Sequence, residues 1–341
     1  MPRRFGWAFL PDEKLLQLRL KDLKVTLKGT WLEERLDRLH AELKRRRLPI
    51  KPHAWVSDEW FSPDTTPGIA IPFYLTDPRL MQLERKMILD VEGGTLPECL
   101  RILRHEACHA LQHAYQLHRR RRWQKLFGRS STRYPSYYRP NPASRNHVQH
   151  LRLWYAQSHP DEDFAETFAV WLAPRSKWRE RYAGWPALKK LEYVDELMAE
   201  IAGQKPLLTR RLEVDPLSRL TRTLAEHYRK KQAHYWVDFP KIYDQDLRRI
   251  FSDDPRHHQS IAASTFLRRH RAGIRHMVAK WTGEFQLTLD AVFDDMIGRC
   301  RDLKLRAVGS ERQLKMDFIV LLTAKTLQSH YNPSRRQWIA L

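Results

Sequence analysis

The feature that most constrains this chain is the string His105-Glu106-Ala107-Cys108-His109, which falls in the middle of a segment with helical periodicity. The spacing of apolar residues predicts a helix over residues 96–118, opened by Thr95 and Glu98 as a capping box. The apolar positions that would pack this helix are Leu103, Ala107, Ala110 and Leu111. The HExxH string is therefore predicted to lie in the interior of a helix that apolar residues pack.

The spacing of the two histidines indicates a metal site. His105 and His109 lie one helical turn apart on one face, so both imidazoles can reach one ion at about 2.0–2.1 Å. Glu106 lies beside the water bound to such an ion, whose pKa zinc lowers to about 7, and can accept its proton. The alternative interpretation is a pair of buried histidines that are hydrogen-bonded and hold no metal.

The third ligand is not supplied by the same helix. A metzincin would have a glycine and a histidine where this chain has Gln112 and Tyr115. His113 is also unsuitable, because it stands about 12 Å from His105 along a helix that rises 1.5 Å per residue. We therefore expect a ligand from another element.

A second predicted helix, over residues 159–172, offers carboxylates in the required arrangement. Pro160 suits its first turn, and Glu162 and Glu166 lie one turn apart on the face opposite its phenylalanines. Such a pair provides one carboxylate for the metal and one to hold a ligand histidine. The alternative is that these residues form the polar face of an ordinary amphipathic helix.

Three segments together resemble the bacterial family of putative zinc-binding metallopeptidases, a gluzincin-like group: RHEACHALQHAY, NPASRNHVQHL and YAQSHPDEDFAETFAVWL. The resemblance runs from about residue 53 to residue 203, and more loosely back to residue 15. It implies a zincin fold, in which the HExxH helix lies under a small sheet and a second helix brings a glutamate.

The resemblance also implies roles for individual residues. In anthrax lethal factor, the first glutamate of an ExxxE helix is the ligand, so the resemblance implies Glu162 as ligand and Glu166 as the partner of a ligand histidine. A tyrosine seven residues before that ligand stabilises the oxyanion, and this offset falls on Tyr155; the alternative is a tyrosine packed beside Trp154. Cys108 replaces a residue that is often glycine or small, and it is expected to point away from the metal. The expected site is one zinc per chain, held by the two histidines and the first glutamate.

The remaining sequence predicts an α+β fold that is mostly helical. Glycine is scarce, at 12 of 341 residues, about half the usual frequency of roughly 7%, and this favours helices. We expect a zincin-like metallopeptidase domain over residues 1–203 and a basic, all-helical domain of unknown role over residues 206–341. The boundary is placed at the GQKP segment, residues 203–206.

Local patterns predict further elements of the first domain. Helices are expected over residues 31–47 and 187–202, and strands over residues 53–61 and 68–76 with a turn between them. Pro72 cannot donate to a ladder, so the second strand is expected at an edge, where a peptide substrate could add as a further strand.

The charge of the chain suggests an acidic partner. The net charge is +21, spread along the sequence. Nucleic acid, an acidic protein or anionic lipid would be attracted to such a surface, although a solvated basic surface is an equally simple interpretation. The run Arg119–Arg122 follows the first predicted helix, where positive charge is favourable in any case.

Composition also bears on the compartment. The three cysteines, Cys99, Cys108 and Cys300, form no CxxC pair, which suits a reducing environment. No run of 18 apolar residues exists, and the N-terminus has no apolar core long enough for a signal peptide. A cytoplasmic protein with no membrane segment is therefore expected.

Together these patterns predict hydrolysis of peptide bonds in a protein or peptide substrate, by metal-activated water with Glu106 as general base. One alternative is a nucleic-acid-associated protease, superficially like SprT-type enzymes. The other is a non-catalytic module that keeps zinc as a structural element. A glutamate in the position of the base favours an enzyme, because a structural site has no use for one.

Overall fold

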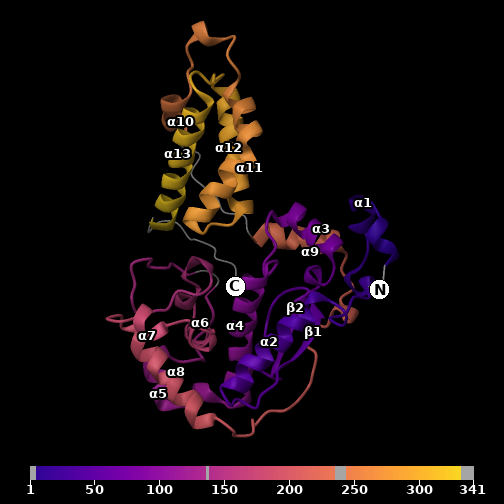
Figure 1. Ribbon diagram of the computed structural model, residues 1–341. Coiled ribbons are helices and arrows are strands. Elements are labelled where there is room, and N and C mark those ends of the chain that lie inside the picture. The colour runs from indigo at the N-terminus through magenta and orange to yellow at the C-terminus, as the bar shows by residue number, and fades with distance from the viewer. Residues whose placement is uncertain (1–4, 136–137, 235–242, 332–341) are drawn as a thin grey trace. The chain divides into compact units, whose positions relative to one another are not determined.

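The computed structural model describes residues 5–135, 138–234 and 243–331 of the 341-residue chain. Most of the chain up to Lys230 forms one compact unit, and the chain from Lys231 onwards forms most of a second. The fold is α+β and mostly helical, as the sequence predicts, with one two-stranded sheet in the described ranges (Figure 1).

The first unit contains both strands and nine helices wholly or mostly within it. These elements are α1 (Asp12–Leu15), α2 (Trp31–Arg45), β1 (His53–Ser57), β2 (Gly68–Pro72), α3 (Pro78–Ile88), α4 (Leu96–Ala114), α5 (Arg121–Phe127), α6 (Pro160–Leu172), α7 (Trp178–Arg181), α8 (Ala187–Ile201) and α9 (Leu224–His234).

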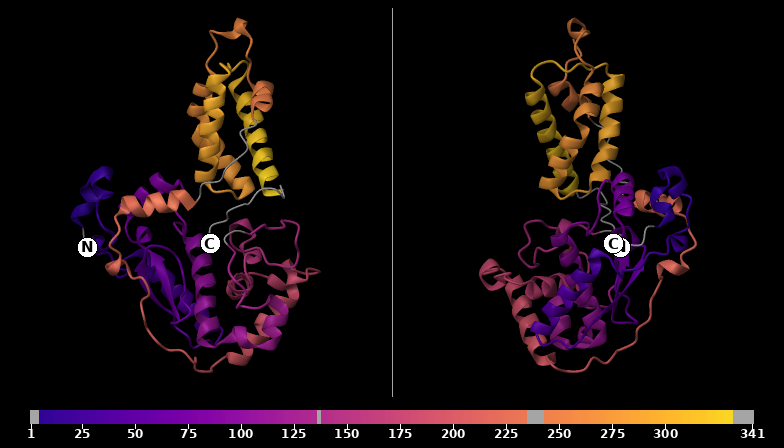
Figure 2. Two further views of the ribbon diagram at one scale, coloured as in Figure 1. Left: turned by 180° about the vertical axis from the view of Figure 1, so that it is seen from behind. Right: turned by 45° about the vertical axis from the view of Figure 1, so that its right-hand side comes forward.

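Helix α4 is the central element of this unit. It packs against α6 on one side and against α2 and β2 on the other (Figures 1 and 2). Thr95 precedes the helix but its side chain makes no capping hydrogen bond, so the predicted capping box does not form. The helix ends before the expected residue 118, because Gln116 adopts a left-handed backbone with φ of 51°. Since α4 is covered on both sides, its polar residues are buried.

The two predicted strands exist, but they are shorter than expected and pair in parallel. His53 lies opposite Gly68 and Ser57 lies opposite Pro72, so the chain between them crosses over and does not form a hairpin. A Cβ atom at Gly68 would lie 2.5 Å from the side chain of His53, and only glycine permits this close approach. Residues Phe73–Thr76 turn away from the sheet as a 3-10 helix.

Strand β2 is not the open edge that the sequence suggests. All five of its residues are buried, and the N–H of Ala70 donates to the carbonyl of Phe61 at 2.8 Å. The segment after β1 therefore already occupies the position where a substrate strand was expected to add. The expectation was wrong because Pro72 shows only that one backbone N–H is missing from β2. Which segment lies beside β2 depends on the course of the chain between the two strands.

The helices that flank α4 begin and end close to the residues that the sequence predicts. Helix α2 begins after Thr30, whose hydroxyl accepts from the N–H of Leu32 at 3.3 Å. Helix α8 is followed by Gly203, whose φ of 77° is in the left-handed region that terminates helices. Helices α3 and α5 were not anticipated.

Residues beyond the expected boundary at 203–206 still pack on the first unit. The indole of Trp55 donates to the carbonyl of Val214 at 2.9 Å, and Ser57 donates to that of Asp215 at 2.6 Å. The first unit therefore continues to Lys230 as a folded body. The division into a metallopeptidase domain and a second functional domain stays a prediction.

The second unit is helical throughout its described residues and contains α10 (Asp244–Ile250), α11 (Ala263–Thr282), α12 (Gln286–Asp302) and α13 (Glu311–Tyr331). Four phenylalanines contribute to its core: Phe251, Phe266, Phe293 and Phe318. Within the described ranges of both units, every helix is too short or too polar to cross a membrane.

A buried ion pair joins α4 to α2. Arg104 donates from Nε and Nη2 to the two carboxylate oxygens of Glu42 at 2.7 and 2.9 Å, and both side chains are buried. A bidentate pair of this kind is strong, but it leaves a costly charge behind if one partner is removed.

We therefore predict that Glu42→Ala lowers the free energy of unfolding by about 3–5 kcal/mol, because Arg104 is left buried without a counter-charge. Urea denaturation measures the change. Glu34→Ala, an exposed position on the same helix, serves as control and should change little. The double variant Glu42→Leu with Arg104→Met should recover most of the loss; an equally unstable double variant would contradict this account.

Candidate metal centre

Helices α4 and α6 bring three candidate ligands to one point. His105 Nε2 lies 2.9 Å from Glu162 Oε2 and 3.1 Å from His109 Nε2, and the last two atoms are 3.3 Å apart. All three side chains are buried. In the described part of the chain, this is the one trio of histidine, cysteine and acidic side chains whose donor atoms converge in this way.

The separations suit a zinc ion. Ligand atoms placed tetrahedrally at about 2.0–2.1 Å from zinc lie about 3.3–3.4 Å from one another. The observed values of 2.9–3.3 Å are close to this range. Two imidazoles and one carboxylate are also the donor set of catalytic zinc sites, which leave a fourth position for water or substrate. The residues present therefore fit the metal.

Glu166 holds His105 in the orientation that such a site requires. Its Oε1 lies 2.9 Å from His105 Nδ1, and its Oε2 accepts from the backbone N–H of Leu151 at 2.7 Å. Because Nδ1 faces a carboxylate, Nε2 is the nitrogen that points at the other ligands. Glu162 therefore lies in the cluster and Glu166 lies behind His105, which is the arrangement that the family resemblance implies.

Charge complementarity governs the protonation of the cluster. Burial alone would lower the pKa of His105, but the carboxylates of Glu162 and Glu166 raise that pKa well above its usual value. Burial would raise the pKa of Glu162, yet His109 and His105 lower it well below its usual range. A divalent cation would take the place of the imidazole protons, since metal binding requires neutral histidines.

Glu106 is a buried carboxylate without a partner. Its exposed fraction is 8%, and it makes no hydrogen bond or ion pair with any residue in the described ranges. Burial raises its pKa, while the charges of His105 and His109 act in the opposite direction. A buried carboxylate is costly unless it is paired, so its position next to the cluster indicates a use other than stability.

Helix α6 does not present an ordinary polar face, because its acidic residues are buried. Asp161 accepts from Gln112 at 2.8 Å, and Asp163 pairs with Lys190 at 2.5 Å. The helix begins at Pro160, and His159 caps it by accepting the N–H of Asp161 at 3.2 Å. The alternative of a solvated acidic face is therefore wrong.

Tyr155 lies beside the cluster. Its ring centroid is 5.6 Å from that of His105, and the two rings are tilted by 51°. The preceding residues Leu153 and Trp154 both adopt left-handed backbones, with φ of 56° and 55°. Such conformations cost about 1–3 kcal/mol each and persist only where the surrounding structure holds them. They turn the chain so that Tyr155 meets His105, while Trp154 is only half-buried.

Two other predicted residues lie away from the cluster. His113 pairs with Asp64 at 3.0 Å and its ring contacts that of His118, so it is held by other groups, as its position along the helix predicts. The thiol of Cys108 is buried 3.8 Å from the carbonyl of Phe164.

Tyr134 is a site residue that sequence reasoning missed. Its hydroxyl donates to Glu162 Oε1 at 2.9 Å, and its ring stacks on His159 at a centroid distance of 3.7 Å. The two oxygens of the Glu162 carboxylate therefore have different partners: Oε2 lies near the histidines, and Oε1 accepts from Tyr134. Tyr134 stands in a loop 28 residues before Glu162, where no periodicity relates the two. A tyrosine just before a proline was the only available signal.

The comparisons with known proteins bear on the same segment. No curated protein and no solved structure matches the chain. Residues 97–180 match the model of the family described as "Putative zinc-binding metallo-peptidase". The matched span includes His105, Glu106, His109 and Glu162, so the part of the chain that forms the cluster is the part that is similar to this zinc-binding metallopeptidase family.

Proposed function

We propose that the first unit is a zincin-like, gluzincin-type peptidase that hydrolyses peptide bonds with one zinc per chain. The observation that carries the proposal is the convergence of His105, His109 and Glu162 next to the buried carboxylate of Glu106, which has no partner among the residues that the structure describes. The similarity of residues 97–180 to a zinc-binding metallopeptidase family supports the same chemistry.

The protein's own residues divide the work as follows. Zinc, when bound by His105, His109 and Glu162, polarises a carbonyl group and makes a water molecule more acidic. Glu106 accepts the proton of the attacking water and then delivers it to the leaving amine. A carboxylate suits both steps, because it can take up a proton and release it again.

Surrounding residues orient these groups. Glu166 fixes the ring of His105 through Nδ1, and Tyr134 holds the far oxygen of Glu162. Tyr155 is placed against His105, from where its hydroxyl can donate to the carbonyl oxygen as negative charge develops on it. The water-excluding environment of the buried cluster strengthens each of these interactions.

A non-catalytic zinc module is the second candidate. It also accounts for the convergence of His105, His109 and Glu162, although a structural zinc site usually has four protein ligands and this cluster supplies three. It gives no reason for Glu106, whose carboxylate is buried at an energetic cost and binds nothing else in the described ranges. We therefore favour the peptidase.

We predict that the purified protein holds one zinc, which His109→Ala or Glu162→Ala removes because two remaining ligands bind it far more weakly. Glu166→Ala and Tyr134→Phe should lower zinc affinity by about 10–100-fold, the usual effect of losing a group that orients a ligand. Titration against a chelator measures both effects. His113→Ala is the matched control, since this histidine lies on the same helix but outside the cluster. A larger loss from Glu166→Ala than from Glu162→Ala would mean that the two roles are exchanged.

Glu106→Gln should keep the zinc and the melting temperature but lower turnover by about 10²–10⁴-fold, because the amide cannot accept a proton. Cleavage sites are first identified by incubating the wild-type protein with a proteome-derived peptide library, and kcat is then measured on the best substrate. Near-normal turnover by the variant would contradict the role of Glu106. A wild-type protein that binds zinc and cleaves nothing in the library would favour the non-catalytic module.

Tyr155→Phe removes only a hydroxyl and should lower kcat by roughly 10²–10³, equivalent to about 2.7–4 kcal/mol, with zinc content unchanged. Tyr193→Phe is a suitable control, because the Tyr193 hydroxyl has no hydrogen-bond partner in the described ranges. If Tyr155→Phe turns over normally, or loses activity only because it melts, Tyr155 is a packing residue.

A further inference from the structure

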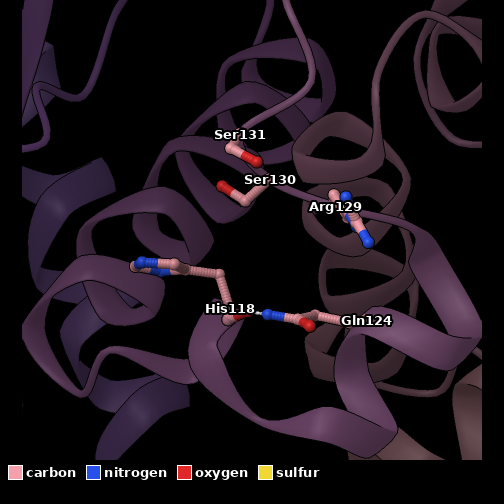
Figure 3. Close-up of a pocket in the computed structure, with 5 residues that line it drawn as sticks. All are labelled: His118, Gln124, Arg129, Ser130 and Ser131. Carbon is pink, nitrogen blue, oxygen red and sulfur yellow. Dashed lines mark hydrogen bonds between the residues drawn. The ribbon is translucent and has the colours of Figure 1, made fainter.

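A pocket of about 370 Å³ opens in the first unit, in the chain that follows α4 (Figure 3). Its lining comes from the chain around α5 and consists of His118, Gln124, Arg129, Ser130 and Ser131. Ser130 and Ser131 lie across the pocket from His118 and Gln124, and Arg129 lies to one side (Figure 3). Every lining side chain carries a hydrogen-bond donor, and none is acidic or apolar.

Two contacts connect this pocket to the metal centre. Ser130 donates to Asp161 Oδ2 at 2.8 Å, and Asp161 immediately precedes Glu162 in α6. The ring of His118 lies 5.7 Å from that of His113, which follows His109 by one turn of α4. The pocket is therefore formed by chain that packs on α4 and α6, the two helices that carry the candidate ligands.

The segment that forms the pocket is strongly basic. Residues 117–133 contain seven lysines and arginines and no acidic residue. Arg120 and Arg122 are neutralised by Glu200 and Glu196 on α8. Arg129 is exposed and has no ion-pair partner in the described ranges, so its charge remains available to a ligand.

The nearby acidic groups are already engaged. Asp161 accepts from both Ser130 and Gln112, and Asp64 is paired with His113. Burial and the charge of His113 lower the pKa of His118, so Arg129 supplies the fixed charge of the pocket.

We propose that this Arg129 pocket binds the carboxylate of an acidic side chain in the peptide substrate, a subsite that rests on the proposed peptidase function. The Arg129 guanidinium and the Ser131 hydroxyl are donors that match a carboxylate, and charge-assisted hydrogen bonds of this type are strong. The hydroxyl of Ser130 already donates to Asp161. The volume of about 370 Å³ leaves room for one acidic side chain. A nucleic-acid duplex, the other partner that the basic charge suggests, would need an open basic surface and would not enter such a pocket.

Binding of blocked peptides to the zinc-loaded full-length chain tests the proposal. The peptides are fluorescent decapeptides of neutral residues that carry glutamate at each position in turn, and the same peptide with glutamine at that position is the reference. The protein carries Glu106→Gln in every measurement, so that cleavage is slow. We expect glutamate at one position to tighten binding at least about tenfold, which is about 1.4 kcal/mol. Arg129→Gln should remove this preference. Arg121→Gln, an exposed arginine on α5 outside the pocket, should keep it.

Three results would overturn the pocket assignment. The first is that glutamate is preferred at no position. The second is that Arg121→Gln loses the glutamate preference as fully as Arg129→Gln, which would mean that the overall positive charge attracts the peptide. The third is that duplex DNA displaces the acidic peptide and that DNA binding also needs Arg129. The readout is independent of hydrolysis. If the wild-type protein cleaves no peptide but the preference and its loss in Arg129→Gln are found, the pocket stands and the peptidase proposal fails.

Discussion

The structure depends on burying the acidic first half of α6 against α4. Four carboxylates in six residues, Asp161, Glu162, Asp163 and Glu166, are all inaccessible to solvent or nearly so. Removing an unpaired carboxylate from water costs several kcal/mol even after relaxation, so α6 can dock only where each charge meets a partner. Gln112, the two histidines of α4 and Lys190 of α8 supply these partners. The contacts that fold the first unit are therefore the same contacts that form the candidate metal centre.

The elements that the sequence predicted correctly are those determined by neighbours along the chain. Helices α2, α4, α6 and α8 follow from apolar periodicity with recognisable ends, and the shared face of His105 and His109 follows from helical geometry. Glu162 lies on another helix, and its role as a ligand was implied by the family resemblance. The strands were located, but their pairing was not, because it depends on the crossover that brings Phe61 beside Ala70. Tyr134 could not have been predicted, since its contact with Glu162 depends on the fold of a loop.

Burial was the property least accessible from the sequence. The ExxxE segment resembles the polar face of an amphipathic helix, and only the packing of α4, α5 and α8 around α6 shows that this face is internal. The position of Tyr155 depends similarly on two left-handed residues, neither of which is a glycine. The sequence also could not show how much of the charge of the run Arg119–Arg122 is neutralised. In the structure, Glu196 and Glu200 pair with two of its four arginines. Among the residues that line the pocket, Arg129 carries a charge with no ion-pair partner in the described ranges.

The central claim is that one zinc ion is held by two imidazoles and one carboxylate at the junction of α4 and α6. X-ray absorption at the zinc edge of the loaded protein tests it most directly. The account predicts a first shell of only nitrogen and oxygen atoms at about 2.0–2.2 Å, in which the two imidazoles are identified by their outer-ring scattering. A sulfur atom at about 2.3 Å, or a shell with one imidazole or none, would place the metal elsewhere and contradict the account.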